Sequence, residues 1–418
     1  MKLSVLLPTR DRLELLRHAV DSVTRLNDDD WEIVISDNCS SGDVEGYVGS
    51  LQDSRIRYVR TPRLFSITEN WNNALAHSRG DYVVMLGDDD ALLGSYFMRT
   101  RELVAEFDHP QVIYHNALGY AYPGVIPGEE HGLLRSEGYA PFIREATGPA
   151  RLPCDRAREI ARGVADFRLS YGFNMQFVTV ARDAIEELTR DGEFFHSPFP
   201  DYYAMNHLFA CAHSIVVEPR PLVVIGISPR SYGFYFYNHR EREGRSLLEG
   251  KARPAEPRAG QPPLLPGLNI NNGWLRATEE LYEQLGSPAD FKPNYRRYRA
   301  LQILHVYTGS LLQSTVPAEQ LEELKRLMSG HERLLYDTLF AALSTVARVL
   351  PKRARSQVPR LITLLARQLP WWDPVPAAGR FRDISDVVER VVGVDDVARW
   401  QRQRGSRLRG AILAWVFP

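Results

Sequence analysis

The 418-residue sequence has few cysteines, no long apolar run and almost no net charge. Its cysteines, Cys39, Cys154 and Cys211, lie far apart, which excludes a disulfide framework or a zinc knuckle and fits the reduced thiols of a cytoplasmic protein. There is no apolar run of about 18 residues and no charged leader before an apolar core, so we expect neither a spanning helix nor a signal peptide. The net charge of −1 gives no reason to expect a nucleic acid partner.

What the sequence does contain is an alternation of strand and helix patterns, in a composition typical of globular proteins. Apolar runs predict strands at residues 3–7, 31–35, 56–59 and 83–86, and helical periodicity predicts helices at residues 12–24 and 67–77. This order is typical of an α/β fold with a mostly parallel sheet and helices on both faces. Later strands are predicted at residues 111–115 and 177–181, with edge strands at 215–217 and 222–225.

Changes in composition divide the chain into three predicted parts. Residues 1–240 form the α/β domain, and residues 241–270, rich in charge and proline, form a mobile loop or linker. Residues 271–418 form a mainly helical C-terminal domain. Its tail, residues 399–418, is basic and aromatic. This composition is typical of an interfacial anchor, which would make the chain a peripheral membrane protein. A terminal helix packed on its own domain, or in a homo-oligomer contact, explains the tail equally well.

Three consecutive carboxylates, Asp88, Asp89 and Asp90, follow the strand predicted at residues 83–86. Such side chains repel one another unless a positive charge lies between them. Mg²⁺ and Mn²⁺ take oxygen ligands and bridge carboxylates to phosphates. A solvated acidic turn is the alternative. Open α/β sheets bind ligands at the carboxyl ends of their strands, and this position favours the metal interpretation.

Five short segments in the first third of the chain resemble the glycosyltransferases of family 2, which have the GT-A fold. The segments are residues 6–12 (LLPTRDR), 33–40 (IVISDNCS), 72–76 (NNALA), 80–83 (GDYV) and 86–90 (LGDDD). Each is short, and their order and spacing make the combination specific. The resemblance implies a metal-dependent inverting transferase that uses Mn²⁺ or Mg²⁺ and a nucleotide-diphosphate sugar. It extends over about the first 240 residues.

The resemblance also implies which residues contact the nucleotide. The loop after the first strand, with Pro8, Thr9 and Arg10, would line the base and the ribose. Asp37, at the end of the second strand, would accept a hydrogen bond from the nucleobase, although an Asx-turn or a helix cap is the alternative. Asn72 matches a family position near the nucleotide, and an ordinary asparagine on a helix surface is nearly as good an explanation.

The triple aspartate corresponds to the family's DxD motif, and its register is ambiguous. In one alignment Gly87 replaces the first aspartate of the motif and Asp89 is the second. Asp88 and Asp90 also form a literal DxD pair. We favour Asp89 as the direct metal ligand. Asp88 would contact the ribose or a metal-bound water, and we count it among the metal-binding residues. Asp90 would orient the turn.

A catalytic base is expected at the start of a later helix, and Asp201 matches that position. Pro198 and Pro200 precede it and favour an extended approach to a helix that runs to about Ala210. The resemblance assigns Asp201 the removal of a proton from the acceptor hydroxyl. The alternative is that Asp201 is only an N-cap. Pro200 replaces the acid that more commonly precedes the base in this family.

The aromatic segment at residues 227–237 has two interpretations. It could close over the substrates with Arg230 touching phosphate, or it could be an aromatic patch packed under the helical domain.

The sequence leaves the donor and the acceptor open. A UDP-sugar is the default donor, with dTDP and GDP open, and the acceptor is a glycan, a lipid-linked molecule or a small molecule. A second hypothesis is a nucleotidyltransferase or phosphohydrolase, which predicts a Gly-rich loop with lysine after the first strand; residues 8–12 have neither. A third is a non-catalytic binding protein on the same scaffold, against which the retention of Asp37, Asp88, Asp89 and Asp201 argues.

Overall fold

The computed structural model describes most of the chain. The described residues are 1–126, 129–136, 143, 146–168, 172, 174–189, 193–196, 199–238, 240, 241, 243, 244, 263–313, 315–349 and 380–391. Most of the predicted linker (residues 245–262) and the basic aromatic tail (residues 399–418) lie outside them. Within the described ranges, no helix combines the length and the apolar character needed to cross a bilayer.

The first half of the central sheet is parallel, and the four strands predicted for it are confirmed to within two residues. The strand order is β3-β2-β1-β4. Paired residues at the ends of three strands, Thr9, Asp37 and Arg60, bring their carboxyl ends to one edge of the sheet. The strands are β1 (Leu3–Thr9), β2 (Trp31–Asp37), β3 (Ile56–Arg60) and β4 (Tyr82–Met85).

Beyond β4 the sheet becomes mixed. β9 pairs antiparallel with both β4 and β6, β7 pairs antiparallel with β6, and β11 closes the edge on β7. The short strands β5 and β8 pair with β10. The strands are β5 (Ala91–Leu92), β6 (Val112–Ala121), β7 (Gly132–Ser136), β8 (Ala150–Leu152), β9 (Val178–Ala181) and β11 (Arg380–Phe381).

The two edge strands predicted at residues 215–217 and 222–225 are wrong, because they are one strand, β10 (Ile215–Ile227), paired in parallel with β6. Two prolines, Pro219 and Pro221, interrupt the apolar pattern, and the register shifts there. The buried Glu218 holds this irregularity together. Its carboxylate accepts hydrogen bonds from the Arg220 backbone at 2.9 Å and from Arg99 Nε at 2.6 Å. The interruption is therefore a bulge within a continuous strand.

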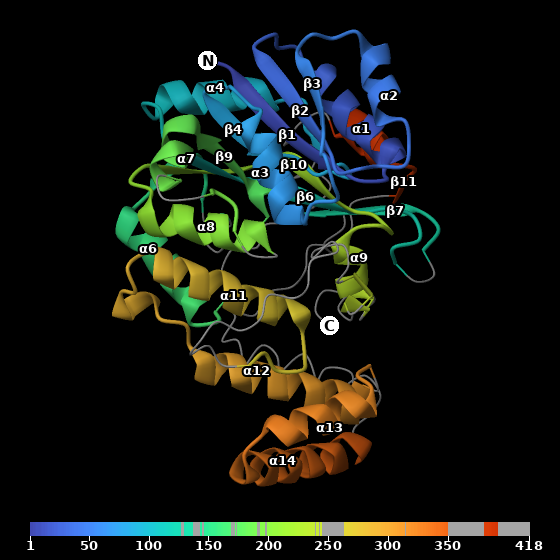
Figure 1. Cartoon of the computed structure of the whole chain (residues 1–418), viewed down its shortest axis with the longest axis vertical. Helices are drawn as coiled ribbons and strands as arrows, with labels where there is room; N and C mark the ends of the chain where they lie inside the picture. Colours follow the sequence, from blue (N-terminus) through green and yellow to red (C-terminus); the bar gives the residue numbers. More distant parts are fainter. Residues whose placement is uncertain are drawn as a thin grey trace.

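Helices flank the sheet (Figure 1), which confirms the predicted α/β architecture. Five of the described helices of this region, α2, α4, α6, α7 and α9, were not predicted; α2 contains Gly46 and Gly49, which lower helix propensity. The helices of this region are α1 (Leu13–Thr24), α2 (Val44–Leu51), α3 (Ile67–Ala76), α4 (Tyr96–Glu106), α6 (Cys154–Ala165), the 3₁₀ turn η1 (Met175–Phe177), α7 (Arg182–Leu188), α8 (Pro200–Cys211) and α9 (Tyr232–Tyr237).

A mainly helical C-terminal region follows and is confirmed, with its helices arranged in succession below the sheet in Figure 1. After Thr308 the α-helix α12 continues directly as a π-helical turn. The elements are α11 (Asn269–Gln284), the 3₁₀ turn η2 (Ala289–Phe291), α12 (Tyr295–Thr308), the π turn η3 (Gly309–Gln313), α13 (Ala318–Leu327) and α14 (Gly330–Val349).

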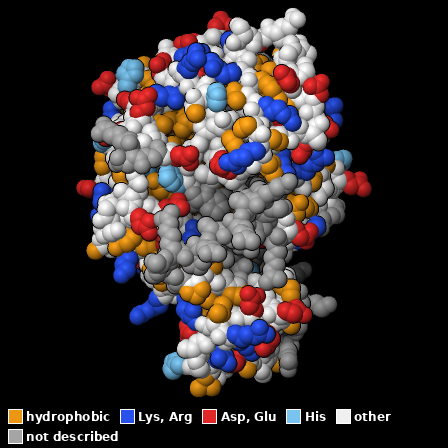
Figure 2. All heavy atoms as spheres, in the orientation of Figure 1, with side chains coloured by type: hydrophobic (Ala, Val, Ile, Leu, Met, Phe, Trp, Pro, Cys, Tyr) orange, Lys and Arg blue, Asp and Glu red, His pale blue; other side chains and the backbone are white. Residues whose placement is uncertain are grey.

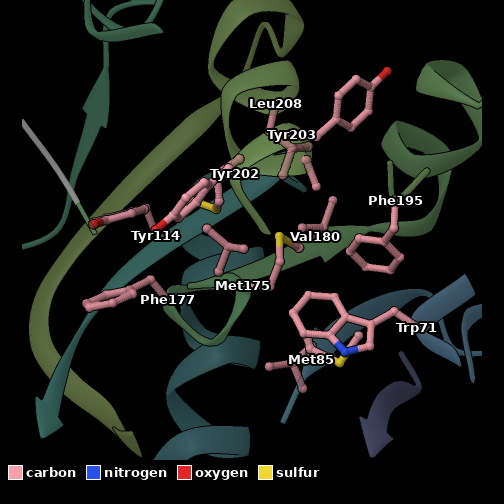
Figure 3. Packing of buried hydrophobic residues seen from close by; sticks show 14 of the residues in the cluster. Trp71, Met85, Tyr114, Met175, Phe177, Val180, Phe195, Tyr202, Tyr203 and Leu208 are labelled. Carbon is pink, nitrogen blue, oxygen red and sulfur yellow. The ribbon is translucent and has the colours of Figure 1, made fainter. Parts of the chain in front are cut away.

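The first helices of this region share the apolar core of the α/β part. Trp274 of α11 is 2% exposed and lies against Phe167 and Tyr202, with ring centroids at 5.5 and 6.2 Å. Figure 3 shows another part of the same cluster, where Trp71 and Phe195 meet edge to face at 5.2 Å. α11 is therefore packed onto α8. The apolar core continues across the predicted boundaries at residues 240 and 270.

A segment late in the chain returns to the N-terminal sheet. Phe381 of β11 pairs with Gly132, and α17 (Ile384–Arg390) lies beside α1, coloured red in Figure 1. His18 Nδ1 and Ser385 Oγ are 2.7 Å apart. Residues 380–391 therefore pack on the α/β part, although they fall within the range predicted as the helical C-terminal domain.

The shared core makes a prediction about stability. Trp274→Ala removes a buried indole between α11 and α8, and large aromatic truncations in a core cost about 3–5 kcal/mol. We expect a loss of that order in the free energy of unfolding, measured by urea denaturation. Leu334→Ala is the control, since Leu334 is 70% exposed and should change it by less than about 0.5 kcal/mol. Equal stability of the Trp274 variant and wild type would contradict the packing.

Candidate active site

The candidate site lies where the parallel strands end. β1 ends at Thr9, β2 ends at Asp37, and β4 leads through Leu86 into residues 87–90, called here the acidic turn. Thr9 Oγ1 donates a hydrogen bond to Asp88 Oδ2 at 2.7 Å, so the end of β1 directly contacts the acidic turn. The strand register thus brings together residues that are far apart in the sequence.

Asp88 is held by two side chains from the start of the chain. Its Oδ2 accepts from Thr9, and its Oδ1 accepts from Arg12 Nη1 at 2.8 Å. The Asp88 side chain is 4% exposed and that of Arg12 20%. Asp88 therefore forms a buried ion pair, in which both carboxylate oxygens have donors from the protein.

Asp90 organises the acidic turn. Its Oδ2 accepts from the Gly87 backbone and from Gln176 Nε2, both at 2.8 Å, and its Oδ1 accepts from the Gly226 backbone at 2.7 Å. A Cβ atom on Gly87 would lie 2.5 Å from Asp90 Oδ2, so the turn requires glycine at that position. Asp90 thus ties the turn to η1 and β10, which fits the orienting role expected for it.

Asp89 is 7% exposed, and its hydrogen bonds fall on one oxygen. Oδ2 accepts from Ser228 Oγ at 2.8 Å and from the Ser228 backbone at 3.3 Å. Oδ1 of Asp89 has no hydrogen-bond partner among the described residues. Gly226 makes room for the backbone here, because a Cβ atom on it would lie 1.8 Å from the Asp89 carbonyl oxygen. Asp89 therefore has one carboxylate oxygen free for a ligand.

The electrostatics of the acidic turn follow from burial and close charges. Burial raises the pKa of Asp89, and burial together with the Asp89 carboxylate raises the pKa of Asp90 to about 8. Burial lowers the pKa of Arg12, but the carboxylates of Asp88, Asp89 and Asp90 outweigh it, so its pKa is raised overall. The turn therefore favours a positive charge next to it.

Asp37 is fully buried and uses both oxygens within the protein. Oδ1 accepts from the Ser40 backbone at 2.9 Å, and Oδ2 accepts from Tyr58 Oη at 2.8 Å and Arg60 Nη1 at 2.9 Å. The Arg60 side chain is 46% exposed. Contact between Asp37 and a nucleobase stays a prediction, and Arg60 is the neighbouring group that reaches solvent. Sequence reasoning missed it, although it ends the third parallel strand.

The loop after β1 is fixed to the loop after β2. Asp11 has a positive φ of 54°, its backbone N–H donates to Ser40 Oγ, and its Oδ1 accepts from Ser41 N and Oγ at 2.7 Å. Arg10 is partly exposed, and its Nε lies 3.7 Å from Asp11 Oδ2. Pro8 is also partly exposed. Roles for Pro8 and Arg10 in nucleotide binding stay predictions.

Asn72 holds a neighbouring segment in place. Its Nδ2 donates to Glu193 Oε2 at 2.8 Å and to the Phe195 carbonyl at 2.9 Å, and its Oδ1 accepts from the Phe195 backbone. Its neighbours Asn70 and Asn73 are the ones that bind Ser36, next to Asp37. A nucleotide contact by Asn72 stays a prediction that these bonds do not favour.

Asp201 lies in the first turn of α8, and the N-cap of that helix is Phe199. Its Oδ1 accepts from the Tyr202 backbone at 3.0 Å. Burial raises the pKa of Asp201 to about 7, although that N–H lowers it. A carboxyl group that titrates near neutral pH is suited to accept a proton. Because the N-cap of α8 is Phe199, the interpretation of Asp201 as an N-cap is wrong, and its role as a catalytic base stays a prediction.

Residues 228–241 connect the acidic turn to the helices below the sheet. Ser228 binds Asp89, and the Tyr232 ring meets Phe199 at 5.5 Å, at the start of α8. Tyr232 Oη donates to Glu241 at 2.9 Å, and Glu241 accepts from the backbones of residues 269 and 270 at the start of α11. Tyr232 is therefore packed against the helices, the second of the two interpretations of this aromatic segment.

Arg230 contacts the backbone of the β1–α1 loop. Its Nη1 donates to the Asp11 carbonyl, and Arg12 Nη2 donates to the Arg230 carbonyl, both at 2.7 Å. On the face shown in Figure 2, basic and acidic side chains are interspersed, in keeping with the net charge of −1.

Comparison with known proteins identifies the part of the chain that carries this site. The model of Glycosyl transferase family 2 matches residues 4–123. Residues 4–123 are called here the family 2 segment. The family 2 segment contains Thr9, Asp37 and the acidic turn, whereas Asp201 lies outside it. The recognition made from the short sequence motifs is confirmed.

Two bacterial proteins are similar to the family 2 segment. The GalNAc(5)-diNAcBac-PP-undecaprenol beta-1,3-glucosyltransferase of Campylobacter jejuni is 40% identical over 95 residues, which is 22% of this chain and 31% of that protein. The colanic acid biosynthesis glycosyl transferase WcaA of Escherichia coli is 30% identical over 129 residues, 30% of this chain and 44% of that protein. The matches span less than half the length of either relative.

Among solved structures, the chain is similar to residues 1–349 of TarS from S. aureus. The identity is 14% and the TM-score 0.43, over 78% of this chain and 89% of that one.

The raised pKa of Asp90 makes a prediction about pH. A carboxyl group whose pKa rises from 3.8 unfolded to about 8 folded stabilises the protein below the lower value and loses that contribution as pH rises through the higher one. Asparagine does not titrate. The wild-type free energy of unfolding, measured in urea with chelator, should therefore fall relative to that of Asp90→Asn between about pH 5 and pH 8.

The fully exposed Asp29 provides the control for this measurement. Asp29→Asn makes the same chemical change at a fully exposed side chain and is measured alongside it. A pH-independent difference between Asp90→Asn and wild type would show that the pKa of Asp90 is not raised.

Proposed function

We propose that the protein is a metal-dependent inverting glycosyltransferase, which moves a sugar from a nucleotide-diphosphate sugar to an acceptor hydroxyl. The observation that carries the proposal is the meeting of Thr9, Asp37 and the acidic turn at one edge of the sheet, within the family 2 segment. Parallel α/β sheets bind nucleotides at this edge. The retained carboxylates and their ordered hydrogen bonds speak against a decayed, non-catalytic scaffold.

The acidic turn fits a divalent cation held mainly by Asp89. Asp88 and Asp90 use both oxygens in hydrogen bonds within the protein, and Asp89 has Oδ1 free. In the part of the chain that the structure describes, no three carboxylate, imidazole or thiol side chains gather as a complete metal site. Mn²⁺ or Mg²⁺ prefers oxygen ligands, and when bound it neutralises the charge of a leaving diphosphate. Asp88 would contact the ribose or a metal-bound water.

Asp201 is the proposed general base. A pKa of about 7 lets its carboxylate take the proton of an acceptor hydroxyl at neutral pH. The acceptor oxygen forms a bond to the anomeric carbon as the bond from that carbon to the diphosphate breaks, and the nucleoside diphosphate leaves. Attack from the side opposite the leaving group inverts the configuration at that carbon. The Phe199–Tyr232 contact links the start of α8 to the segment that binds Asp89.

The proposed donor is a UDP-sugar, with dTDP and GDP sugars as alternatives. The name of the Campylobacter relative describes a glucosyltransferase whose acceptor is linked to undecaprenol, and that of the Escherichia relative places it in colanic acid biosynthesis. These names support a role in glycan biosynthesis and a glycan or lipid-linked acceptor. Cytoplasmic location, with peripheral membrane contact through the tail, is part of the same proposal.

The metal assignment is tested by Asp89→Ala. Loss of the Asp89 carboxylate leaves diphosphate charge facing the remaining acids, so we expect the affinity for UDP in Mn²⁺ to fall by at least about 10- to 100-fold. Isothermal titration calorimetry with Mn²⁺ and with chelator measures it. Asp29→Ala, at the surface, is the control. Wild-type affinity in Asp89→Ala would refute Asp89 as a ligand.

Asp201→Asn separates chemistry from donor binding. Asparagine has the same size but accepts no proton, so turnover should fall by a factor of about 10² to 10⁴. Affinity for UDP and the melting temperature should stay close to wild type. The wild-type rate should rise with pH through about 7, where Asp201 ionises, and the residual rate of the variant should lack this rise.

Two results would remove Asp201 from this role. Parallel losses of UDP affinity and turnover would make it a donor-site or structural residue. Full activity of Asp201→Asn would leave it a structural residue only, and the base would have to be another group.

A further inference from the structure

Arg12 is a partly buried cation at the acidic turn that the proposed reaction does not use. Its guanidinium lies between two segments distant in sequence. Nη1 donates to Asp88 Oδ1 at 2.8 Å, and Nη2 donates to the Arg230 carbonyl at 2.7 Å. Its side chain is 20% exposed, so the ion pair is largely shielded from water and salt. Arg12 therefore neutralises part of the charge that a bound cation would otherwise neutralise.

Few carboxylate oxygens remain for a metal while Arg12 is in place. Thr9 and Arg12 take both oxygens of Asp88, and three N–H groups take both oxygens of Asp90. Asp89 contributes Oδ1 alone. Mg²⁺ requires about six oxygen ligands. Within the described part of the chain, the acidic turn thus offers a divalent cation one carboxylate oxygen without a hydrogen bond, Asp89 Oδ1.

We propose that Arg12 is the internal counter-ion of the acidic turn, and that it makes cation uptake depend on the nucleotide. The free protein binds a divalent cation weakly, because Arg12 repels it and holds Asp88. A nucleoside diphosphate supplies the missing oxygen ligands. It also supplies negative charge that offsets the two adjacent positive groups, Arg12 and the divalent cation. The cation and the diphosphate therefore bind as a pair. This inference rests on the proposed function, because it takes the acidic turn as the diphosphate site.

The mutual dependence is a coupling free energy and is reciprocal. The nucleotide raises the affinity for the cation by the same factor by which the cation raises the affinity for the nucleotide. Arg12 acts through Asp88 and through its charge, so it is a positioning residue. Removal of the Arg12 side chain should increase the affinity for the cation in the absence of nucleotide. Loss of a purely structural residue would not increase that affinity.

The experiment measures Mn²⁺ binding to the full chain by electron paramagnetic resonance, with and without UDP. In wild type, UDP should strengthen Mn²⁺ binding by a factor within the usual range of about 5- to 150-fold. In Arg12→Gln, Mn²⁺ binding without UDP should be at least about fivefold tighter than in wild type, because the competing positive charge is gone. The strengthening by UDP should shrink accordingly.

Two matched variants separate charge from structure. Arg230→Gln removes a cation that also bridges the two loops but donates to the Asp11 backbone, so its affinity for Mn²⁺ in the absence of UDP should equal that of wild type. Arg12→Lys keeps the positive charge and should restore the weak binding of wild type. If Arg12→Gln does not fold by circular dichroism, Arg12→Met replaces it, with the same expectation.

Three outcomes would count against the inference. Mn²⁺ binding without UDP that is equal in Arg12→Gln and wild type would overturn the role of Arg12. Wild-type Mn²⁺ binding that is equally tight with and without UDP would overturn joint uptake. If UDP, dTDP and GDP all fail to bind, the proposed function itself fails and joint uptake with it, whereas the measurement on Mn²⁺ alone still tests Arg12 as a counter-ion.

Discussion

Three carboxylates in consecutive positions at the end of a buried strand impose the constraint on which the site depends. Asp88, Asp89 and Asp90 are each at most 7% exposed, so water does not solvate their carboxylate groups. The chain offsets them with backbone N–H groups, two hydroxyl groups, one amide and one guanidinium. Burying unpaired charge is costly, and each of these partners therefore has to be held in position.

The partners outside the turn come from three segments of the α/β fold that are far apart in the sequence. Thr9 and Arg12 come from the β1–α1 connection, Gln176 from η1, and Gly226 and Ser228 from the end of β10. The same segment continues through α9 to Glu241, which binds the start of α11. A continuous set of contacts therefore connects the acidic turn to the helices that carry Asp201 and Trp274.

Local sequence was enough to predict the residues at the strand ends. Thr9, Asp37 and Asp88 each follow an apolar run, and parallel strands align their carboxyl ends at one edge. Their partners could not be predicted in the same way. Gln176 lies next to a predicted strand and Ser228 in the aromatic segment, but neither local sequence indicates a contact with the acidic turn, and only strand pairing brings them to it. Asn72 is the opposite case. It matches a family motif, but that motif did not indicate that the Asn72 amide holds residues 193–196.

The sequence by itself determined the α/β architecture, the parallel order of the first strands and the position of the carboxylates, because these follow from short-range periodicity and from strand ends. Tertiary structure decided the rest. It made β10 one strand across Pro219 and Pro221, returned residues 380–391 to the sheet edge, and packed α11 on α8. It also decided which carboxylate oxygens are engaged. Hydrogen-bond partners and burial depend on contacts between distant segments, and no local pattern encodes them.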